Sequence, residues 1–447
     1  MDGAGWTGDR HIVAEVTLST EPLTLKAARD HMRVAVISLH TSPTATLGQS
    51  ANGGLNVYVR EVCAALSRQG IATDVFTRRL SDEGPAFESL APLSRVVYLP
   101  AGGGDVGKYE LADQVPTFTD ALEDFVERCG ISYDLIYSHY WVSGLAACRL
   151  RGRLRLPWVH TAHTLAVVKN RKLAPGDQPE PELRLLREGE IARCADLLVV
   201  STAGEGDELR RAYGVRPDRL STISPGVDLL AFQPRARQLA RSQLGYPDQR
   251  LFVFVGRLER LKGVDLILRA LALLSAGGAH PELRLLVLGE DSGAGGVSEK
   301  ARLQALAWEL GIGHLVHFLG SVPQHRLASY YAAAEAVLMP SYNESFGLAG
   351  LEAQACGTGV IASGEAGLAS VVRDGVSGFL VERPDPELYA DRMRRVLEEP
   401  GLTERLGRSG RRLAERFSWQ RTADELLARF QVLARDQLGV QATARAE

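Results

Sequence analysis

The chain has 447 residues, of which 45% are hydrophobic and 23% are charged, and its formal net charge at pH 7 is −3. This length predicts two or three domains, or one large enzyme with two lobes. The nearly balanced charge gives no reason to expect nucleic acid or an anionic membrane surface as a partner.

The cysteines and the N-terminal residues indicate the cellular compartment in which the protein folds. The five cysteines are scattered and never spaced as C-x-x-C, which argues against a disulfide framework or a zinc site and fits a reducing cytoplasm. No apolar run approaches the ~18 residues of a membrane span. Residues 1–31 lack the apolar core of a signal peptide, and we expect a disordered leader or an over-extended start there.

The first half of the chain alternates apolar strands with helices. We expect helices at 57–69, 115–129 and 169–193, and strands at 33–39, 71–78, 134–139, 156–164, 197–202 and 220–224. Between the first strand and the first helix lies a glycine-containing loop, 40–56, a geometry that can cradle an anion. It has no G-x-G-x-x-G, so a dinucleotide fingerprint is absent.

Polar residues follow several of these strands at their carboxyl ends, where ligands bind in parallel α/β sheets. His139, Tyr140 and Trp141 end one strand, and His163 ends another. A histidine at such a tip is more often functional than one inside a strand, so we favour His163 over His160.

A linker, 229–250, precedes a second alternating half. Its expected helices are 264–274, 300–310, 326–334, 346–356 and several within 385–436, and its strands are 251–255, 283–288, 316–319, 336–340, 359–362 and 378–381. Two alternating halves predict an α/β protein with two doubly wound, Rossmann-like parallel-sheet domains facing a cleft. We expect an N-terminal domain at 32–229, a C-terminal domain at 230–416 and final helices at 417–447.

The second half carries a candidate anion site. Arg257 and Lys262 follow a buried strand in a glycine-flanked loop. A planar guanidinium, which can donate two parallel hydrogen bonds, and a mobile ammonium together suit a diphosphate. The helix N-terminus near Ser345 adds free backbone N–H groups and a partial positive charge. Glu344 and Glu352 can face one ligand only if Glu344 stays in the loop, because eight residues on one helix would splay them by roughly 80°.

These residues resemble a known family. The motifs G-R-x-x-x-x-K-G (256–263) and E-S-F-G-L-x-x-x-E (344–352) are similar to the donor site of the retaining glycosyltransferases of family 4, which have the GT-B fold. The resemblance implies a UDP-sugar donor, no required cofactor and no metal. It implies donor contacts by Gly54, Arg257, Lys262, Glu344, Ser345, Phe346, Gly347, Leu348 and Glu352, with catalysis by His163, Glu344, Arg257 and Lys262.

The first half narrows the resemblance. The stretches S-L-H-T-S-P, G-G-L-N-V-Y-V, S-H-Y-W-x-S-G and V-H-T-A-H-T-L-A-x-V-K-N are similar to family members that glycosylate inositol phosphate in mycothiol synthesis. They imply N-acetylglucosamine as the sugar and 1D-myo-inositol 3-phosphate, a phosphorylated polyol, as the acceptor. The implied acceptor residues are His40, Asn56, Lys108, Tyr140, Thr164 and Arg184. The family's acidic residue before the glycine pair is replaced here, by Asn52.

Three alternatives remain beside this interpretation. A sucrose-phosphate synthase-like transfer to a sugar phosphate shares much of the scaffold. A non-catalytic nucleotide-sugar-binding protein is disfavoured by the intact motif residues, and an oxidoreductase by the missing dinucleotide fingerprint. We expect small-molecule partners and no nucleic acid, and leave the choice between monomer and homodimer open.

Overall fold

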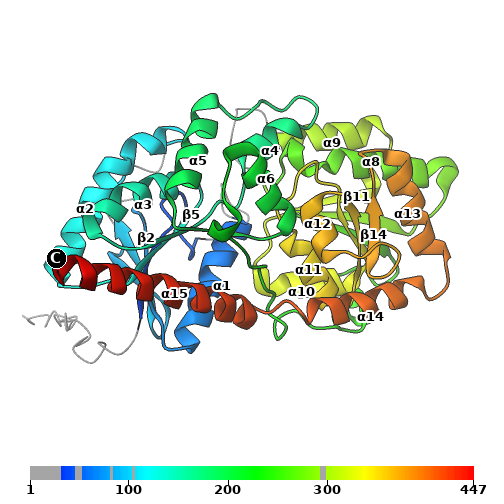
Figure 1. Cartoon of the computed structure of the whole chain (residues 1–447). Coiled ribbons are helices and arrows are strands. Elements are labelled where there is room, and N and C mark those ends of the chain that lie inside the picture. The colour runs from blue at the N-terminus through cyan, green and yellow to red at the C-terminus, as the bar shows by residue number, and fades with distance from the viewer. Residues whose placement is uncertain (1–31, 46–52, 81–83, 103–105, 292–297, 447) are drawn as a thin grey trace, which may run out of the picture.

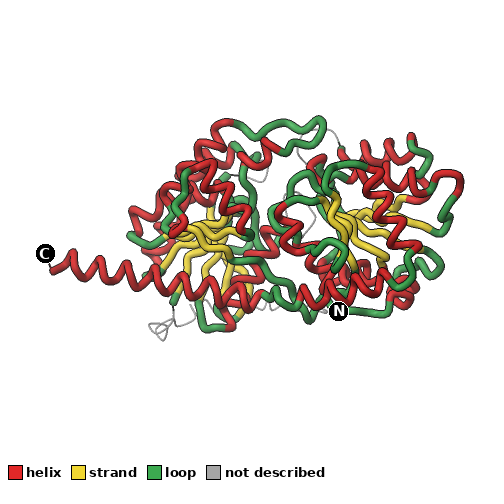
Figure 2. The backbone as a smooth tube through the Cα atoms, turned by 45° about the vertical axis from the view of Figure 1, so that its right-hand side comes forward, coloured by secondary structure: helices red, strands yellow, loops and turns green. Residues whose placement is uncertain are grey.

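In a computed structural model of the chain, the structure describes residues 32–45, 53–80, 84–102, 106–291 and 298–446. The expected leader, 1–31, and Asn52 lie outside the described residues. Two sheets lie side by side, each covered by helices on both faces (Figures 1 and 2). One sheet is built from the first half of the chain and the other from the second half.

The first sheet has the strand order β3-β4-β2-β1-β5-β6-β7-β8. Its pairs are parallel except for β3 with β4, an antiparallel edge. The strands are β1 (Arg33–Ile37), β2 (Ala72–Arg78), β3 (Phe87–Ala91), β4 (Ser94–Leu99), β5 (Leu135–His139), β6 (Trp158–Thr161), β7 (Leu197–Val200) and β8 (Leu220–Thr222). The helices are α1 (Gly54–Arg68), α2 (Val115–Cys129), α3 (Trp141–Leu154), α4 (Ala166–Arg171), α5 (Glu182–Cys194) and α6 (Ala203–Tyr213).

The second sheet is parallel throughout, in the order β11-β10-β9-β12-β13-β14. Its strands are β9 (Arg250–Val255), β10 (Leu283–Leu288), β11 (Val316–Gly320), β12 (Ala334–Met339), β13 (Gly359–Ser363) and β14 (Gly378–Val381). Its helices are α7 (Arg237–Gln243), α8 (Val264–Leu274), α9 (Glu299–Glu309), α10 (Gln324–Ala333), α11 (Leu348–Ala355), α12 (Ala366–Val371), α13 (Pro386–Glu398) and α14 (Leu402–Ala414).

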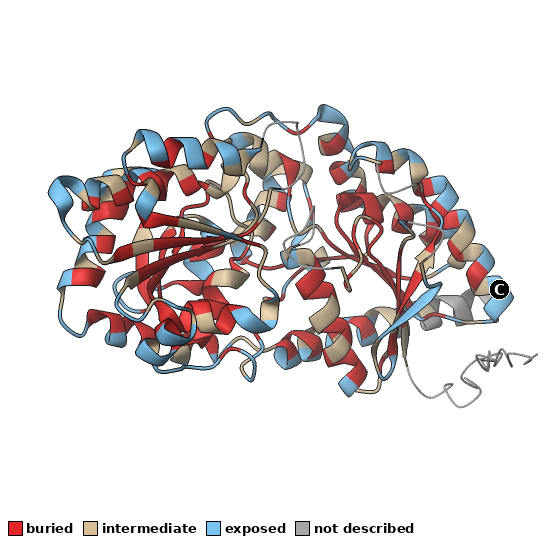
Figure 3. Ribbon diagram, turned by 180° about the vertical axis from the view of Figure 1, so that it is seen from behind, coloured by how far each residue is buried: buried red, intermediate tan, exposed pale blue. Residues whose placement is uncertain are grey.

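Each sheet separates two apolar cores, as expected for strands buried on both faces. Figure 3 shows most strands as buried and the outer helix faces as exposed; the edge strand β3 is the exception, with three of its five residues exposed. In the second half, one core gathers around Phe252 and Ile267, and the other around Val253 and Tyr331. Alternate residues of β9 thus enter opposite cores, which is the period of a strand.

The last helix, α15 (Trp419–Ala446), leaves the second half and runs along the first (Figure 1). It packs against α1, and Trp419 and Phe430 are buried in the core that contains Tyr137. Thr422 Oγ1 donates to the carbonyl of Ser224 at 2.8 Å. The C-terminal segment therefore ties the two halves together.

Several element boundaries differ from the sequence-based expectations. The expected helix 169–193 is two helices, α4 and α5, because Pro175, Pro179 and Pro181 interrupt it. Helix α1 begins at Gly54 rather than 57, and α11 begins at Leu348 rather than 346. The expected linker 229–250 contains α7, and β3 and β4 are strands that were not predicted from the sequence.

Candidate active site

The candidate site lies where the strand order reverses in each sheet. In the first sheet β1 has β2 on one side and β5 on the other, and in the second β9 lies between β10 and β12. At such a switch point the loops after the two central strands diverge and leave a crevice. These loops carry His40 and Tyr140 in the first half, and Arg257 and Glu344 in the second.

The two loops of the second half lie against each other. Tyr342 N donates to the Leu261 carbonyl at 2.9 Å. Gly263 has φ +67°, and a Cβ there would lie 2.3 Å from the Pro340 carbonyl oxygen. Only glycine permits this approach, which brings the end of Lys262 to the loop after β12.

The predicted catalytic cations both contact carboxylates. Lys262 Nζ lies 2.7 Å from Glu344 Oε2, with both side chains about four-fifths buried. Arg257 pairs with Glu259 at 2.8 Å. Glu344 lies in the loop, as the sequence predicted, so it can face a ligand held by Lys262.

Glu352 lies on the second turn of α11 and is 8% exposed. Tyr331 Oη donates to its Oε2 at 2.8 Å, and Gln324 Nε2 donates to Oε1 at 3.3 Å. Burial raises the pKa of Glu352 to about 7, although these two hydrogen bonds oppose the shift. Each carboxylate oxygen keeps a lone pair, so the group can accept two further hydrogen bonds.

The remaining predicted donor residues surround the N-terminus of α11. A Cβ on Gly54 would lie 3.4 Å from Leu348, so the N-terminus of α1 faces that of α11. Gly347 has φ +93°, where a Cβ would clash with Leu368 at 2.6 Å. Phe346 is buried in the core, so only its backbone can face a ligand.

His163 joins the two halves of the site. Its backbone is left-handed, with φ +59°, and its carbonyl accepts from Ser345 Oγ at 2.6 Å. Its Nε2 lies 3.0 Å from His139 Nδ1, and burial lowers the pKa of His163 to about 3. Burial also lowers the pKa of His139, so both rings are neutral, and one donates a hydrogen bond to the other.

His40 lies close enough to both halves of the chain to be affected by charged side chains from each. Its ring is 5.0 Å from that of Tyr140, and no hydrogen-bond partner for its buried Nδ1 is found within the described part of the chain. Burial lowers the pKa of His40 to about 4. Four cations add to this shift through their charge, namely Arg78, Arg257, Lys108 and Arg184. The crevice is therefore electropositive despite the net charge of −3.

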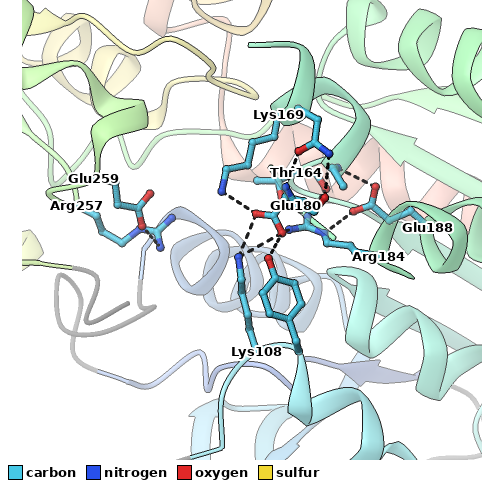
Figure 4. Close-up of polar contacts among 11 residues, drawn as sticks. Lys108, Thr164, Lys169, Glu180, Arg184, Glu188, Arg257 and Glu259 are labelled. Atoms are coloured by element: carbon cyan, nitrogen blue, oxygen red, sulfur yellow. Dashed lines mark hydrogen bonds and ion pairs between the residues drawn. The ribbon is translucent and has the colours of Figure 1, made fainter. Parts of the chain in front are cut away.

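Three of the predicted acceptor residues, Lys108, Thr164 and Arg184, gather into a cluster (Figure 4). Arg184 Nη2 donates to Thr164 Oγ1 at 3.0 Å, and the guanidinium lies 5.1 Å from the Tyr140 ring centroid. Lys108 reaches the same place from the loop before α2. Arg184 is 2% exposed, whereas the Lys108 side chain is about one-third exposed. Of these two cations, the lysine is therefore the one that a ligand arriving from solvent can reach.

Sequence reasoning missed Glu180, which lies at the centre of this cluster (Figure 4). Its carboxylate contacts Lys108 at 3.1 Å, Lys169 at 2.7 Å and Arg184 at 2.8 Å. Burial opposes its ionisation, but the charge of Arg184 and the hydrogen bond from Lys169 hold the pKa of Glu180 below its ordinary value. The spacing of Glu180, Arg184 and Glu188, four residues apart, could have revealed these pairs.

Asn56 lies deeper than the other predicted acceptor residues. It is fully buried, its Nδ2 donates to Thr41 Oγ1 at 2.8 Å, and its Oδ1 accepts from Gly53 N at 3.1 Å. The side chain thus caps the start of α1 and orders the loop after β1.

The described residues hold neither a group of side chains suited to a metal ion nor a helix suited to a membrane span. Within residues 32–45, 53–80, 84–102, 106–291 and 298–446, no group of three or more His, Cys, Asp or Glu side chains is arranged to hold a metal ion. No helix of the described chain is long and apolar enough to cross a membrane.

Comparison with known proteins identifies the family. The "Glycosyl transferase 4-like domain" model matches residues 53–226, and the "Glycosyl transferases group 1" model matches residues 236–413. The D-inositol 3-phosphate glycosyltransferase of Corynebacterium jeikeium is 44% identical over 88% of this chain and 95% of its own length. That of Thermobifida fusca is 43% identical over 89% and 93%.

Solved structures agree with the fold. Sucrose-phosphate synthase from Thermosynechococcus elongatus has a TM-score of 0.83 and 33% identity, covering 90% of this chain and 99% of that one. Anabaena HepE, solved with UDP and glucose, has a TM-score of 0.72 at 19% identity over 90% and 100%, which shows the fold alone. The sequence-based predictions of a GT-B architecture and of an enzyme are confirmed. With both halves matched by the family models, the chain belongs to the family 4 glycosyltransferases of the GT-B fold, and it is similar to their inositol 3-phosphate members.

Proposed function

We propose that the enzyme transfers N-acetylglucosamine from its UDP-sugar to 1D-myo-inositol 3-phosphate, with retention of anomeric configuration. The observation that carries this proposal is the pairing of two half-sites. Arg257 and Lys262 lie at the switch point of one sheet, and the cluster around Arg184 contacts Tyr140, which follows β5 at the switch point of the other. Inositol 3-phosphate relatives at 40–44% identity support the acceptor.

The donor is held by the second half in this proposal. Arg257 and Lys262 bind the diphosphate and stabilise the charge that develops on the leaving group, the role for which preorganised cations are suited. The N-terminus of α11 contributes backbone N–H groups. Glu352 accepts from the ribose hydroxyls through its remaining lone pairs, and Glu344 binds the sugar hydroxyls beside Lys262.

The acceptor is held by the first half. Lys108, Tyr140, Thr164 and Arg184 bind its phosphate, while Asn56 lies on the inositol side of the acceptor, together with His40. His163 contacts the donor sugar near the reacting carbon, and its neutral ring, with a pKa of about 3, can accept or donate a hydrogen bond without carrying charge.

In this proposal each domain binds one of the two substrates. We propose that residues 32–229 bind the acceptor, 230–416 bind the donor, and 417–447 return to the first domain. Closure between the domains assembles the site, and the bond from Ser345 to the His163 carbonyl is one contact that closure would form. We further propose a cytoplasmic enzyme that needs no metal or other cofactor.

The test is donor and acceptor profiling of the purified protein, with mass spectrometry and NMR of the product. We expect one N-acetylhexosamine added to inositol phosphate with an α linkage, and no product from unphosphorylated inositol. A second candidate is hexosyl transfer to a sugar phosphate, favoured by the likeness to sucrose-phosphate synthase at 33% identity. Product from fructose 6-phosphate, and none from inositol phosphate, would select it.

A further inference from the structure

The acceptor cluster already contains an anion of its own. Lys108 and Lys169 both converge on Glu180 Oε1, at 3.1 and 2.7 Å, and Arg184 Nη1 lies 2.8 Å from Oε2. Tyr109 donates its hydroxyl to Oε2 as well. Three cations and a hydroxyl around two oxygens are the partners that a phosphate group would take.

The chain holds Glu180 in place from the backbone side. Asn170 Oδ1 accepts from Glu180 N at 2.7 Å, and Asn170 Nδ2 donates to the Glu180 carbonyl at 3.0 Å. Glu180 is 4% exposed. These two bonds fix the backbone of Glu180, and the side chain, 2% exposed, is held by its contacts with the two lysines and Arg184.

The lysines, in contrast, remain open to the crevice. The Lys108 side chain is 34% exposed and that of Lys169 is 25% exposed, against 2% for Glu180. An ammonium group has three donors on a flexible stem. Each lysine can therefore keep one hydrogen bond to Glu180 below while it donates to an anion above.

We propose that Glu180 is a specificity-determining residue, a resident carboxylate that competes with the acceptor phosphate for Lys108, Lys169 and Arg184. This inference rests on the proposed phosphorylated acceptor, and it adds Lys169 to the residues that meet the phosphate. With Glu188 also paired to Arg184, the three cations and two carboxylates leave a net charge of only +1. Small free anions are thus bound weakly, and an acceptor whose hydroxyls supply further contacts is favoured over them.

The test compares Glu180→Gln with wild type, using inorganic phosphate as the probe. Removing one negative charge a few Å from the anion should tighten phosphate binding on the order of tenfold. Calorimetry gives its Kd, and competition against the acceptor gives its inhibition constant. The acceptor KM should change less than the phosphate Kd, so discrimination between them falls. The matched control is Glu182→Gln, an exposed carboxylate two residues away, which should change neither value.

The outcomes separate this inference from the proposed function. Equal or weaker phosphate binding by Glu180→Gln would overturn it, because Glu180 would then only organise the cations. If that variant does not fold, Glu180→Asp draws the carboxylate back from the lysines and should tighten phosphate binding about two- to threefold. Absence of phosphate binding in every variant also overturns the inference, yet product from inositol phosphate would leave the proposed function standing.

Discussion

Replacing Lys262 tests the donor site most directly. Its ammonium is bonded to Glu344 at 2.7 Å and the side chain is 20% exposed, so two of its three donors remain for a diphosphate. Lys262→Ala removes a charge-assisted hydrogen bond, worth about 1.5–3 kcal/mol. It also leaves Glu344 unpaired and facing the diphosphate, so the total loss is about 2–4 kcal/mol, or roughly 30- to 1,000-fold in Kd.

The assay is calorimetry with UDP, which needs no acceptor. The pairing with Glu344 supplies a second, sharper expectation. In the double variant Lys262→Ala/Glu344→Gln the repulsive carboxylate is gone, so part of the lost affinity should return, and the two effects should not add. Arg383→Ala removes an exposed cation from the same half of the chain and serves as the control for net charge. Unchanged UDP binding by Lys262→Ala would refute the donor assignment.

Three other predictions address the acceptor, the pH dependence and the fold. Arg184→Ala should raise the acceptor KM and leave donor hydrolysis unchanged; a raised donor KM instead would show that the cluster is not the acceptor site. The pKa of Glu352 is about 7 in the native state against 4.5 unfolded, so the native state binds more protons in this window and stability falls as pH rises from about 4.5 to 7, by up to about 3 kcal/mol. Glu352→Gln should remove the Glu352 share of this slope and leave that of buried Glu205, whose pKa is also raised to about 7; urea unfolding at several pH values measures it, and a wild-type slope in the variant would contradict it. Phe430→Ala should lower the free energy of unfolding by about 3–5 kcal/mol, because the ring is fully buried against Tyr137; the exposed Val432→Ala is the control, and equal losses in the two variants would contradict this.

The strand pattern was the most predictable part of the fold. Runs such as LFVFV at 251–255 are apolar on both faces because a parallel sheet is covered on both sides, and the structure has β9 there. The boundaries were less predictable. Residues 169–193 carry helix-forming residues at both ends, but three prolines between them remove backbone donors and split the segment.

Within the site, residues whose position depends on nearby sequence could be predicted, and those that depend on distant partners could not. The placement of Glu344 in a loop and Glu352 on the second turn of α11 followed from spacing on a single element. Glu180 was missed because only one of its three cationic partners, Arg184, lies at a helical spacing from it, and only the fold brings Lys108 to it across 72 residues. A residue whose role depends on such distant partners leaves little mark in its own neighbourhood.

The pairing of these cations with carboxylates bears on how the chain would recognise the proposed anionic ligands with a net charge of −3. Arg184 and Lys262 are each paired with a carboxylate, so neither of these two cations is an uncompensated charge before a ligand arrives. A ligand phosphate then has to replace or share these carboxylates, which lowers affinity for any anion that offers nothing else. Donor and acceptor both offer hydroxyls as well as phosphate. Because Arg184 and Lys262 are already paired with carboxylates, a ligand gains little affinity from its charge alone. Its hydroxyls must supply the remaining contacts, so the site selects the whole molecule.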